Sequence, residues 1–179
     1  MTENTAVFPL YPGVTQLDFT GPFEVFSRLP ETRCVLAATQ GGQVEGSGGL
    51  SVANVLPLAR IDRCTLLCVP GGYGCIAAME DEAYLAALRR LSASTRYITS
   101  VCTGSLLLGA AGLLRGRRAA CHWAWRGLLA AFGATPDPAR PEVLEVARAR
   151  MDALRVERDA AVRRAAARLA ALAERSRTS

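Results

Sequence analysis

The sequence predicts an α/β three-layer sandwich, in which helices cover both faces of a mostly parallel β-sheet. Several short runs are apolar throughout rather than alternating, which is typical of strands that are buried on both faces. These runs alternate along the chain with segments of helical periodicity, the order that favours a parallel sheet. With 179 residues, 50% of them hydrophobic, the chain is long enough to bury one such core.

The first strand is expected at residues 6–11, where AVFPLY ends before a Pro-Gly pair. A helix should follow this strand. The triplet Thr20, Gly21 and Pro22 predicts where the helix starts, because proline is favoured in the first helical turn.

The rest of the body repeats this alternation. The Gly-rich stretch at 41–54 indicates a hairpin or a pair of short strands, and 57–64 indicates a short helical turn. Further strands are expected at residues 34–39, 65–70, 97–102 and 117–121, and helices at 75–91, 103–114 and 122–132.

Three loops of this arrangement should meet at one edge of the sheet. They carry the sequences LDFTGP (17–22), PGGYG (70–74) and VCTGS (101–105). Each follows a predicted strand, and ligand sites in α/β sheets form at the carboxyl ends of the strands. We therefore expect the functional site at this edge.

Cys102 lies where a predicted strand gives way to a predicted helix. A side chain on such a sharp turn projects into open space, as a nucleophile requires. The following helix would point backbone N–H groups and its positive dipole end at the thiol, which predicts a lowered pKa and a reactive thiolate. A buried core cysteine is the alternative, and it is common for this residue type.

Two other side chains could handle protons beside this thiol. Asp18 stands in an apolar stretch, so its pKa should be raised and it could act as an acid near neutral pH; helix capping is the alternative. His122 is the only histidine of the chain. Its neighbours Trp123 and Trp125 indicate a packed environment, which favours a structural or supporting role.

Small residues at the same edge could bind substrate. Gly71 and Gly72 can present backbone N–H groups as oxyanion donors, although a tight turn alone would also explain them. Thr103 and Gly104 are small enough to let a substrate approach Cys102 closely.

The cysteine pattern favours a reduced protein without a structural metal. The six cysteines do not suit a disulfide framework in a chain of this length, and the N-terminus does not resemble a secretory signal, so we expect a cytoplasmic protein. A zinc site at Cys64 and Cys68 lacks a second pair of ligands nearby. No apolar run is long enough for a membrane span.

Charge is uneven along the chain. All 21 basic residues are arginine, and the net charge is +5. Residues 1–139 carry 11 arginines and 10 acids, whereas residues 140–179 carry 10 arginines and 6 acids. This tail has the pattern of an amphipathic helix, which would dock on the body or on a second subunit. A coiled coil is a weaker alternative, and binding of nucleic acid is not expected because acids interrupt the arginines and aromatic residues are missing.

The segments FPLYPGVTQLDFTGPFEVF, LLCVPGGYG and YITSVCTGSLLLGAAGLLRGRRAACHW resemble the ThiJ/PfpI superfamily over residues 6 to about 136, and within it the isonitrile hydratase family. The resemblance implies a flavodoxin-like fold related to class I glutamine amidotransferases, a homodimer and no cofactor. It implies a lyase that adds water to an isonitrile to give an N-substituted formamide. By the same resemblance, Cys102 is the nucleophile that forms a thioimidate, Asp18 is the essential acid and Thr103 is an active-site neighbour.

The sequence departs from this family after about residue 137. Family members continue with a strand, a Gly-rich turn, a second strand and a long helix, and here the chain passes directly into the tail. We therefore predict an internal deletion, an α/β domain at 1–137 that is incomplete at its C-terminal side, and a helical tail at 138–179. The VCTGS series also resembles the N-terminal domains of AraC-type regulators, so a non-catalytic ligand-sensing module and an inactive remnant are the alternative functions.

Overall fold

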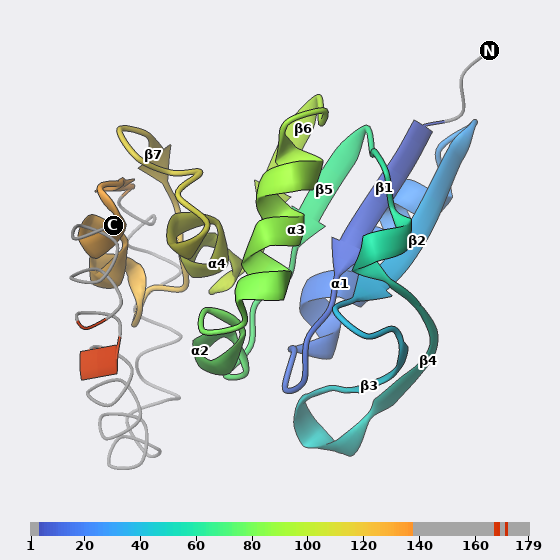
Figure 1. Ribbon diagram of the computed structural model, residues 1–179, viewed down its shortest axis with the longest axis horizontal. Helices are drawn as coiled ribbons and strands as arrows, with labels where there is room; N and C mark the ends of the chain where they lie inside the picture. The colour runs from blue at the N-terminus through green and yellow to red at the C-terminus, as the bar shows by residue number, and fades with distance from the viewer. Residues whose placement is uncertain (1–3, 138–166, 169–170, 172–179) are drawn as a thin grey trace.

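A six-stranded sheet forms the centre of the protein, in the order β3-β4-β2-β1-β5-β6 (Figure 1). The computed structural model describes residues 4–137 together with 167, 168 and 171. Every neighbouring pair in the sheet is parallel except β3 and β4. The strands are β1 (Asn4–Pro9), β2 (Thr32–Ala38), β3 (Gly42–Glu45), β4 (Ser51–Pro57), β5 (Leu66–Val69) and β6 (Tyr97–Ser100).

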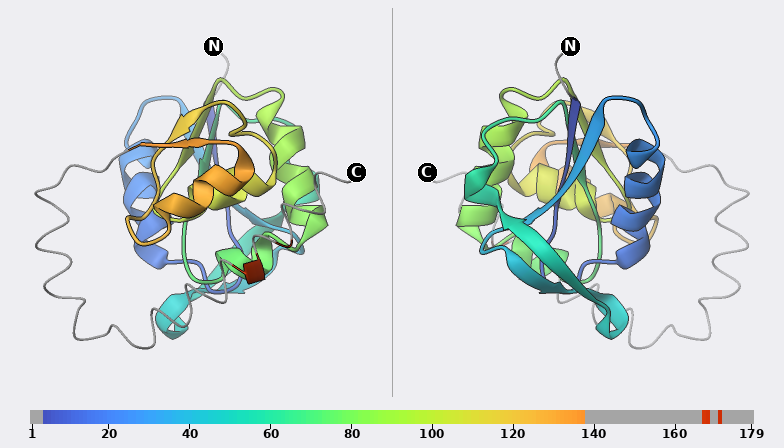
Figure 2. Two further views of the ribbon diagram at one scale, coloured as in Figure 1. Left: turned by 90° about the vertical axis from the view of Figure 1, so that its left-hand side faces the viewer. Right: turned by 90° about the vertical axis from the view of Figure 1, so that its right-hand side faces the viewer.

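Helices cover both faces of this sheet, which confirms the three-layer sandwich. Figure 2 shows α1 on one face and α3 on the opposite face, with the sheet between them. Beyond β6 lie α4, a 3-10 helix η3 and the small parallel pair β7 and β8. The helices are α1 (Gln16–Ser27), α2 (Cys75–Ala78), α3 (Glu82–Ser92), α4 (Gly104–Ala110) and η3 (Arg126–Phe132), and the small pair is β7 (Arg118–Ala119) and β8 (Thr135–Pro136).

The core lies against the middle strands. Val7 and Phe8 of β1 and Leu67 of β5 are fully buried, as uninterrupted apolar runs predict. On the α3 face, Leu88 and Leu91 are also fully buried. The Gly-rich stretch forms the β3–β4 hairpin, one of the two forms expected for it.

The predicted start of the first helix was wrong. α1 begins at Gln16, Thr15 is its N-cap residue, and Pro22 lies inside the helix. Proline there cannot donate an N–H to the carbonyl of Asp18 four residues earlier. Packing outweighs this loss, because Phe23 and Phe26 contact the ring of Phe8 at centroid distances of 5.6 and 6.4 Å.

The helix predicted over residues 75–91 is interrupted. The carboxylate of Asp81 accepts the N–H of Tyr84 at 3.0 Å and caps α3, so a separate helix begins after it. The helix predicted over 103–114 is shorter than expected, since α4 ends at Ala110 and Gly112 adopts a φ of +79°. The helix predicted over 122–132 is the 3-10 helix η3.

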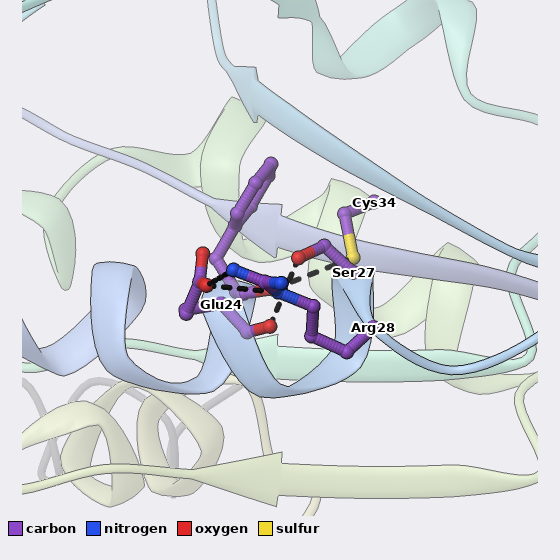
Figure 3. Close-up of polar contacts among 5 residues, drawn as sticks. Glu24, Ser27, Arg28 and Cys34 are labelled. Atoms are coloured by element: carbon purple, nitrogen blue, oxygen red, sulfur yellow. Dashed lines mark hydrogen bonds and ion pairs between the residues drawn. The ribbon is translucent and has the colours of Figure 1, made fainter.

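The end of α1 shows what a structural cysteine does in this fold. Figure 3 shows Cys34 of β2 beside the last turn of α1, where its thiol lies 3.9 Å from the carbonyl oxygen of Phe23. In the same turn the Arg28 side chain donates to the Glu24 carboxylate at 3.0 Å, and the Ser27 hydroxyl donates to the Glu24 carbonyl. Cys34 therefore joins a strand to the helix that covers it.

The predicted tail falls almost wholly outside the described residues. Residues 167, 168 and 171 are helical, and the Arg168 side chain donates to the Glu80 carboxylate at 2.8 Å. The domain boundary at 137, the deletion after it and the amphipathic helix stay predictions. Within the part of the chain that the structure describes, no helix has the length and apolar character needed to cross a bilayer.

Candidate active site

Cys102 stands on the sharp turn that joins β6 to α4. Its φ is +53°, in the left-handed region that residues with a side chain rarely adopt, at a cost of about 1–3 kcal/mol. Backbone contacts hold this conformation. The Cys102 carbonyl accepts the N–H of His122 at 3.2 Å, and the N–H of Val101 donates to Val69 of β5 at 3.0 Å. The predicted strand-to-helix elbow is thus present.

Asp18 comes from α1 and meets Cys102 across the edge of the sheet. Its Oδ2 accepts the backbone N–H of Gly71 at 3.1 Å. The same carboxyl group and the Cys102 thiol are close enough to shift each other's pKa, upward for the thiol and downward for the carboxyl. Asp18 lies in the first turn of α1 and does not cap it, so its side chain serves the edge of the sheet instead.

The prediction of a lowered pKa and a reactive thiolate at Cys102 was wrong. Burial raises the pKa of the Cys102 thiol to about 12, and the nearby charge of Asp18 raises it further, while the N–H of Thr103 opposes the shift. One backbone donor at the start of a seven-residue helix does not outweigh burial next to a carboxylate. The resting thiol therefore keeps its proton, and attack requires a base that removes it.

The prediction that the pKa of Asp18 is raised is confirmed. Burial raises the pKa of the Asp18 carboxyl, whereas the Gly71 N–H, the Cys102 thiol and the charge of His122 lower it. An ionised Asp18 beside a protonated Cys102 forms a base and acid pair that can pass a single proton between them. This arrangement is suited to general acid–base catalysis on a thiol nucleophile.

Gly71 and Gly72 bring the first and second loops together, but not as the expected oxyanion donors. The Gly71 N–H donates to Asp18, and the Gly72 N–H donates to the Thr103 hydroxyl oxygen at 2.9 Å. Gly104 likewise donates its N–H to the Val101 carbonyl at 2.9 Å. All three amides satisfy acceptors of the protein, so they position the site.

Steric space explains why glycines stand at these positions. A Cβ on Gly71 would lie 2.7 Å from Asp18 Oδ2 and 2.8 Å from the Cβ of Cys102. A Cβ on Gly104 would lie 2.1 Å from the Val69 carbonyl oxygen. Gly72 has a φ of +139°, which favours glycine on conformational grounds as well.

Thr103 links the loops that follow β5 and β6. Its buried hydroxyl accepts the Gly72 N–H at 2.9 Å and lies 3.2 Å from the Gly72 carbonyl oxygen, to which it donates. The Thr103 side chain thus bonds both the N–H and the carbonyl of Gly72, next to Cys102. The structure therefore places Thr103 as a bridge between the two loops.

A pocket of about 280 Å³ opens onto Cys102. Tyr73 and Trp125 form an edge-to-face pair on its wall, with ring centroids 6.1 Å apart, and this gives the pocket an apolar side. The lining residues are Thr15, Gly72, Tyr73, Cys102, Thr103, His122, Ala124 and Trp125.

Sequence reasoning missed several of these lining residues. Tyr73 stands in the PGGYG loop that is expected at the site, and an aromatic residue within this Gly-rich loop is the signal that could have identified it. Trp125 was interpreted only as packing around His122. Thr15 precedes α1, and the misplaced helix start concealed it.

The donor set at this edge is one of thiols and a carboxylate. Among the residues that the structure describes, no three His, Cys, Asp or Glu side chains are grouped as metal ligands would be. The six cysteines, all within residues 4–137, are free thiols. The described groups therefore offer acid–base and nucleophilic chemistry.

The fold and this site together define a class of protein: an α/β sandwich with a cysteine on the strand-to-helix turn of its central sheet. Comparison with known proteins assigns the chain to a family of this class. The model of the DJ-1/PfpI family matches residues 4–145. The chain belongs to the DJ-1/PfpI family.

Three individual proteins are similar in sequence to this chain. An isonitrile hydratase of Pseudomonas putida is 47% identical over 132 residues, which are 72% of this chain and 57% of that protein. An uncharacterized protein of Streptomyces lividans, from the cpoL 5' region, is 34% identical over 68% of this chain and 89% of its own length. The HTH-type transcriptional regulator CdhR of Pseudomonas aeruginosa is 33% identical over 65% of this chain, but only 36% of the regulator is covered.

Solved structures show the same fold. A ThiJ/PfpI family protein from Pseudomonas syringae superposes with a TM-score of 0.74 at 39% identity, over 78% of this chain and 59% of that one. DJ-1beta of Drosophila melanogaster superposes with a TM-score of 0.66 at 21% identity, over 76% of each chain. The chain thus spans somewhat more than half the length of its isonitrile hydratase relative and of the Pseudomonas syringae protein.

Proposed function

We propose that this protein is an isonitrile hydratase, a lyase that adds water to an isonitrile and releases an N-substituted formamide. Cys102, which lines a partly apolar pocket, and the Asp18 carboxyl that acts on its thiol carry this proposal. The 47% identity to the Pseudomonas putida isonitrile hydratase supports it. The reaction balances as R–N≡C plus H₂O giving R–NH–CHO.

The first half of the reaction uses the thiol proton. Asp18 accepts the proton of Cys102 as the sulfur attacks the terminal carbon of the isonitrile, and this carboxyl then delivers the proton to that carbon. The product is a thioimidate, R–N=CH–S–Cys102, which contains every atom of the substrate. A thiol with a pKa of about 12 needs such a base in contact with it.

The second half releases the product. A water molecule attacks the thioimidate carbon and gives a proton to Asp18, which passes it to the substrate nitrogen. The tetrahedral intermediate then collapses: the C–S bond breaks, the hydroxyl proton returns to sulfur, and R–NH–CHO leaves. Asp18 is the base and then the acid in each half, a role that its raised pKa favours near neutral pH.

Supporting roles follow from the contacts of the remaining site residues. Thr103 and Gly72 hold the loop beside Cys102, Gly71 holds the Asp18 carboxylate, and Gly104 allows α4 to start against β5. A small-molecule substrate, a homodimeric state and a cytoplasmic location belong to this proposal as further predictions.

The test measures formamide formation from a simple alkyl isonitrile by liquid chromatography and mass spectrometry. The parent should form product, whereas Cys102→Ser should lose turnover by several orders of magnitude. Cys34→Ala is the matched control, because it removes a thiol at the far end of α1 and should keep full activity. Unchanged turnover in Cys102→Ser would refute the covalent route.

A non-catalytic sensor is the second candidate. It is favoured by the 33% identity to the regulator CdhR, over the portion of that protein that this chain covers. A sensor would bind a small molecule in the pocket and stabilise the fold against heat without releasing formamide. A ligand-dependent rise in the melting temperature with no turnover would favour this function.

A further inference from the structure

Tyr11 is a buried tyrosine beside the candidate active site, and the mechanism above gives it no role. It follows β1 in the chain, and only 3% of the residue is exposed. Its hydroxyl donates a hydrogen bond to the carbonyl oxygen of Pro70 at 2.9 Å. Burial raises the pKa of Tyr11 well above its ordinary value, so the hydroxyl keeps its proton. Tyr11 is therefore a neutral hydrogen-bond donor that reaches the loop after β5.

One peptide unit connects this hydroxyl to the Asp18 carboxyl. The Pro70 carbonyl that Tyr11 binds and the Gly71 N–H belong to the same planar amide. That N–H donates to Asp18 Oδ2 at 3.1 Å. Because the described residues contain no cis peptide bond, the carbonyl and the N–H of this amide point in opposite directions. The amide is thus held at one end by Tyr11 and at the other end by Asp18.

Two physical effects pass from Tyr11 to Asp18 through this amide. Because the amide is rigid, a fixed carbonyl oxygen also fixes the direction of the N–H. A hydrogen bond to the oxygen polarises the amide as well, so its N–H becomes a stronger donor. Burial raises the pKa of Asp18, and the Gly71 N–H is the largest of the contributions that lower it. The Tyr11 hydroxyl should therefore favour the ionised form of Asp18.

The backbone next to Tyr11 supports the same geometry. The Tyr11 carbonyl accepts the N–H of Val14 at 3.1 Å, within the turn that leads from β1 to α1. Thr15 is the N-cap residue of α1 and donates its N–H to the Gly71 carbonyl at 2.9 Å. The first turn of α1 carries Asp18. Both partners of the bond between Asp18 and Gly71 are consequently tied to the segment that Tyr11 begins.

We propose that Tyr11 is a positioning residue, whose hydroxyl holds the Pro70–Gly71 amide so that its N–H donates to Asp18. Asp18 thereby stays ionised, and able to accept the Cys102 proton, at lower pH than it otherwise would. Tyr11 is not among the residues that line the pocket at Cys102, so it acts through the amide. The effect on turnover rests on the proposed isonitrile hydratase function, whereas the effect on the ionisation of Asp18 does not.

Other titratable groups also interact with the charge of Asp18. They are Cys102 on the turn between β6 and α4, His122 after β7, and Cys68 in β5. Substitution of Tyr11 by phenylalanine keeps all three groups, and a neutral tyrosine contributes no charge of its own. A change in the ionisation of Asp18 in Tyr11→Phe therefore reports the contact through the amide.

Tyr84 offers a matched control for this substitution. Its buried hydroxyl also donates to a backbone carbonyl, that of Pro9, at the same distance of 2.9 Å. Its ring packs edge-to-face on the Tyr11 ring, with centroids 5.7 Å apart. The N–H of the amide that Tyr84 binds belongs to Leu10 and donates to the Ala37 carbonyl of β2 at 2.6 Å. Tyr84→Phe therefore removes the same kind of bond from an amide that leads away from Asp18.

The experiment measures the pKa of Asp18 by NMR in the parent, Tyr11→Phe and Tyr84→Phe, each labelled with carbon-13 at the aspartate carboxyl carbons. Asp18→Asn identifies the Asp18 signal. Both phenylalanine variants should melt at similarly lowered temperatures, because each loses one buried hydrogen bond. Only Tyr11→Phe should move the titration of Asp18 to higher pH. With a simple alkyl isonitrile, the acid limb of its pH profile for formamide release should move in the same direction, because attack needs an ionised Asp18.

Asp18 pKa values that are equal in the two variants would overturn the proposal, whether both match the parent or both shift together. If Tyr11→Phe does not fold, the parent labelled with carbon-13 at tyrosine Cζ decides instead. The Tyr11 signal should then move as Asp18 titrates and the Tyr84 signal should not, and two signals that behave alike would overturn the proposal. A parent that releases no formamide would refute the proposed function, and the NMR titrations would still decide the role of Tyr11.

Discussion

Substitution of Gly71 by alanine tests the tight contact among the three loops. An added Cβ would lie 2.6 Å from the Thr103 nitrogen, 2.7 Å from Asp18 Oδ2 and 2.8 Å from the Cys102 Cβ. Two of these neighbours are backbone or next to it, so they cannot turn away as the end of a long side chain would. The backbone angles of Gly71 suit alanine, so steric overlap is the whole effect.

The cost follows from overpacking. Extra methyl groups in well-packed regions cost about 1–3 kcal/mol. For a chain of this size, that range corresponds to a fall in melting temperature of roughly 2–12 °C. Relief of the overlap must also separate Asp18 from Cys102, so formamide release should fall more steeply than stability does.

Thermal unfolding by circular dichroism and the formamide assay check this prediction. Gly127→Ala is the matched control, because Gly127 has no positive φ and an added Cβ would meet nothing within 4 Å. Its melting temperature should stay within a few degrees of the parent's, with alanine neutral or slightly favourable. A Gly71→Ala protein that melts and turns over like Gly127→Ala would refute the reasoning.

Three further substitutions or treatments probe the same structure. Because burial raises the pKa of folded Asp18 above its ordinary value of 3.8, the parent should lose stability as the pH rises from 3.8 through the folded pKa. Asp18→Asn should therefore melt higher than the parent at pH 7 and at the same temperature below about pH 3.8. A difference in melting temperature that is constant at all pH values would contradict a raised pKa of Asp18. Alkylation of Cys102 by iodoacetamide, followed by peptide mass mapping, should be slow at pH 8 and keep rising toward pH 12, and Asp18→Asn should move this rise to lower pH because the carboxylate charge that raises the thiol pKa is gone; a plateau near pH 8 in the parent would show a low pKa. Tyr84→Phe removes a buried hydroxyl that donates to the Pro9 carbonyl at 2.9 Å and should cost about 1–3 kcal/mol, whereas Tyr97→Phe on an exposed edge should change little; equal melting temperatures of the two would argue against the buried bond.

The architecture was predictable because burial on both faces leaves a direct mark on composition. The apolar run at residues 6–11, which overlaps β1, and the run that forms β5 contain no polar position, as is typical of strands buried on both faces. Meeting of the three loops followed from the parallel order of the strands alone. Element boundaries were less predictable, because Pro22 signals a helix start locally whereas contacts with Phe8 carry α1 past it.

The candidate site was predictable in its members and not in its electrostatics. Cys102 and Asp18 could be found from their positions, and the resemblance to a known family reinforced them. The ionisation state of the thiol could not be found, since it depends on how much solvent and which charge surround the sulfur after folding. The amides of Gly71 and Gly72 were misjudged for the same reason: a sequence shows that a donor exists, but not which acceptor it meets.

The loops of the site touch each other through their backbones. Gly74 approaches Pro12 so closely that a Cβ there would lie 1.8 Å from the Pro12 carbonyl oxygen, and a Cβ on Gly72 would lie 2.6 Å from the Gly13 oxygen. The positions of the reactive groups are consequently set mainly by contacts between main-chain atoms of the loops. For protein engineering, this separates two tasks: the pocket wall at the exposed Tyr73 can be redesigned for new substrates, while the main-chain scaffold beneath it is left untouched.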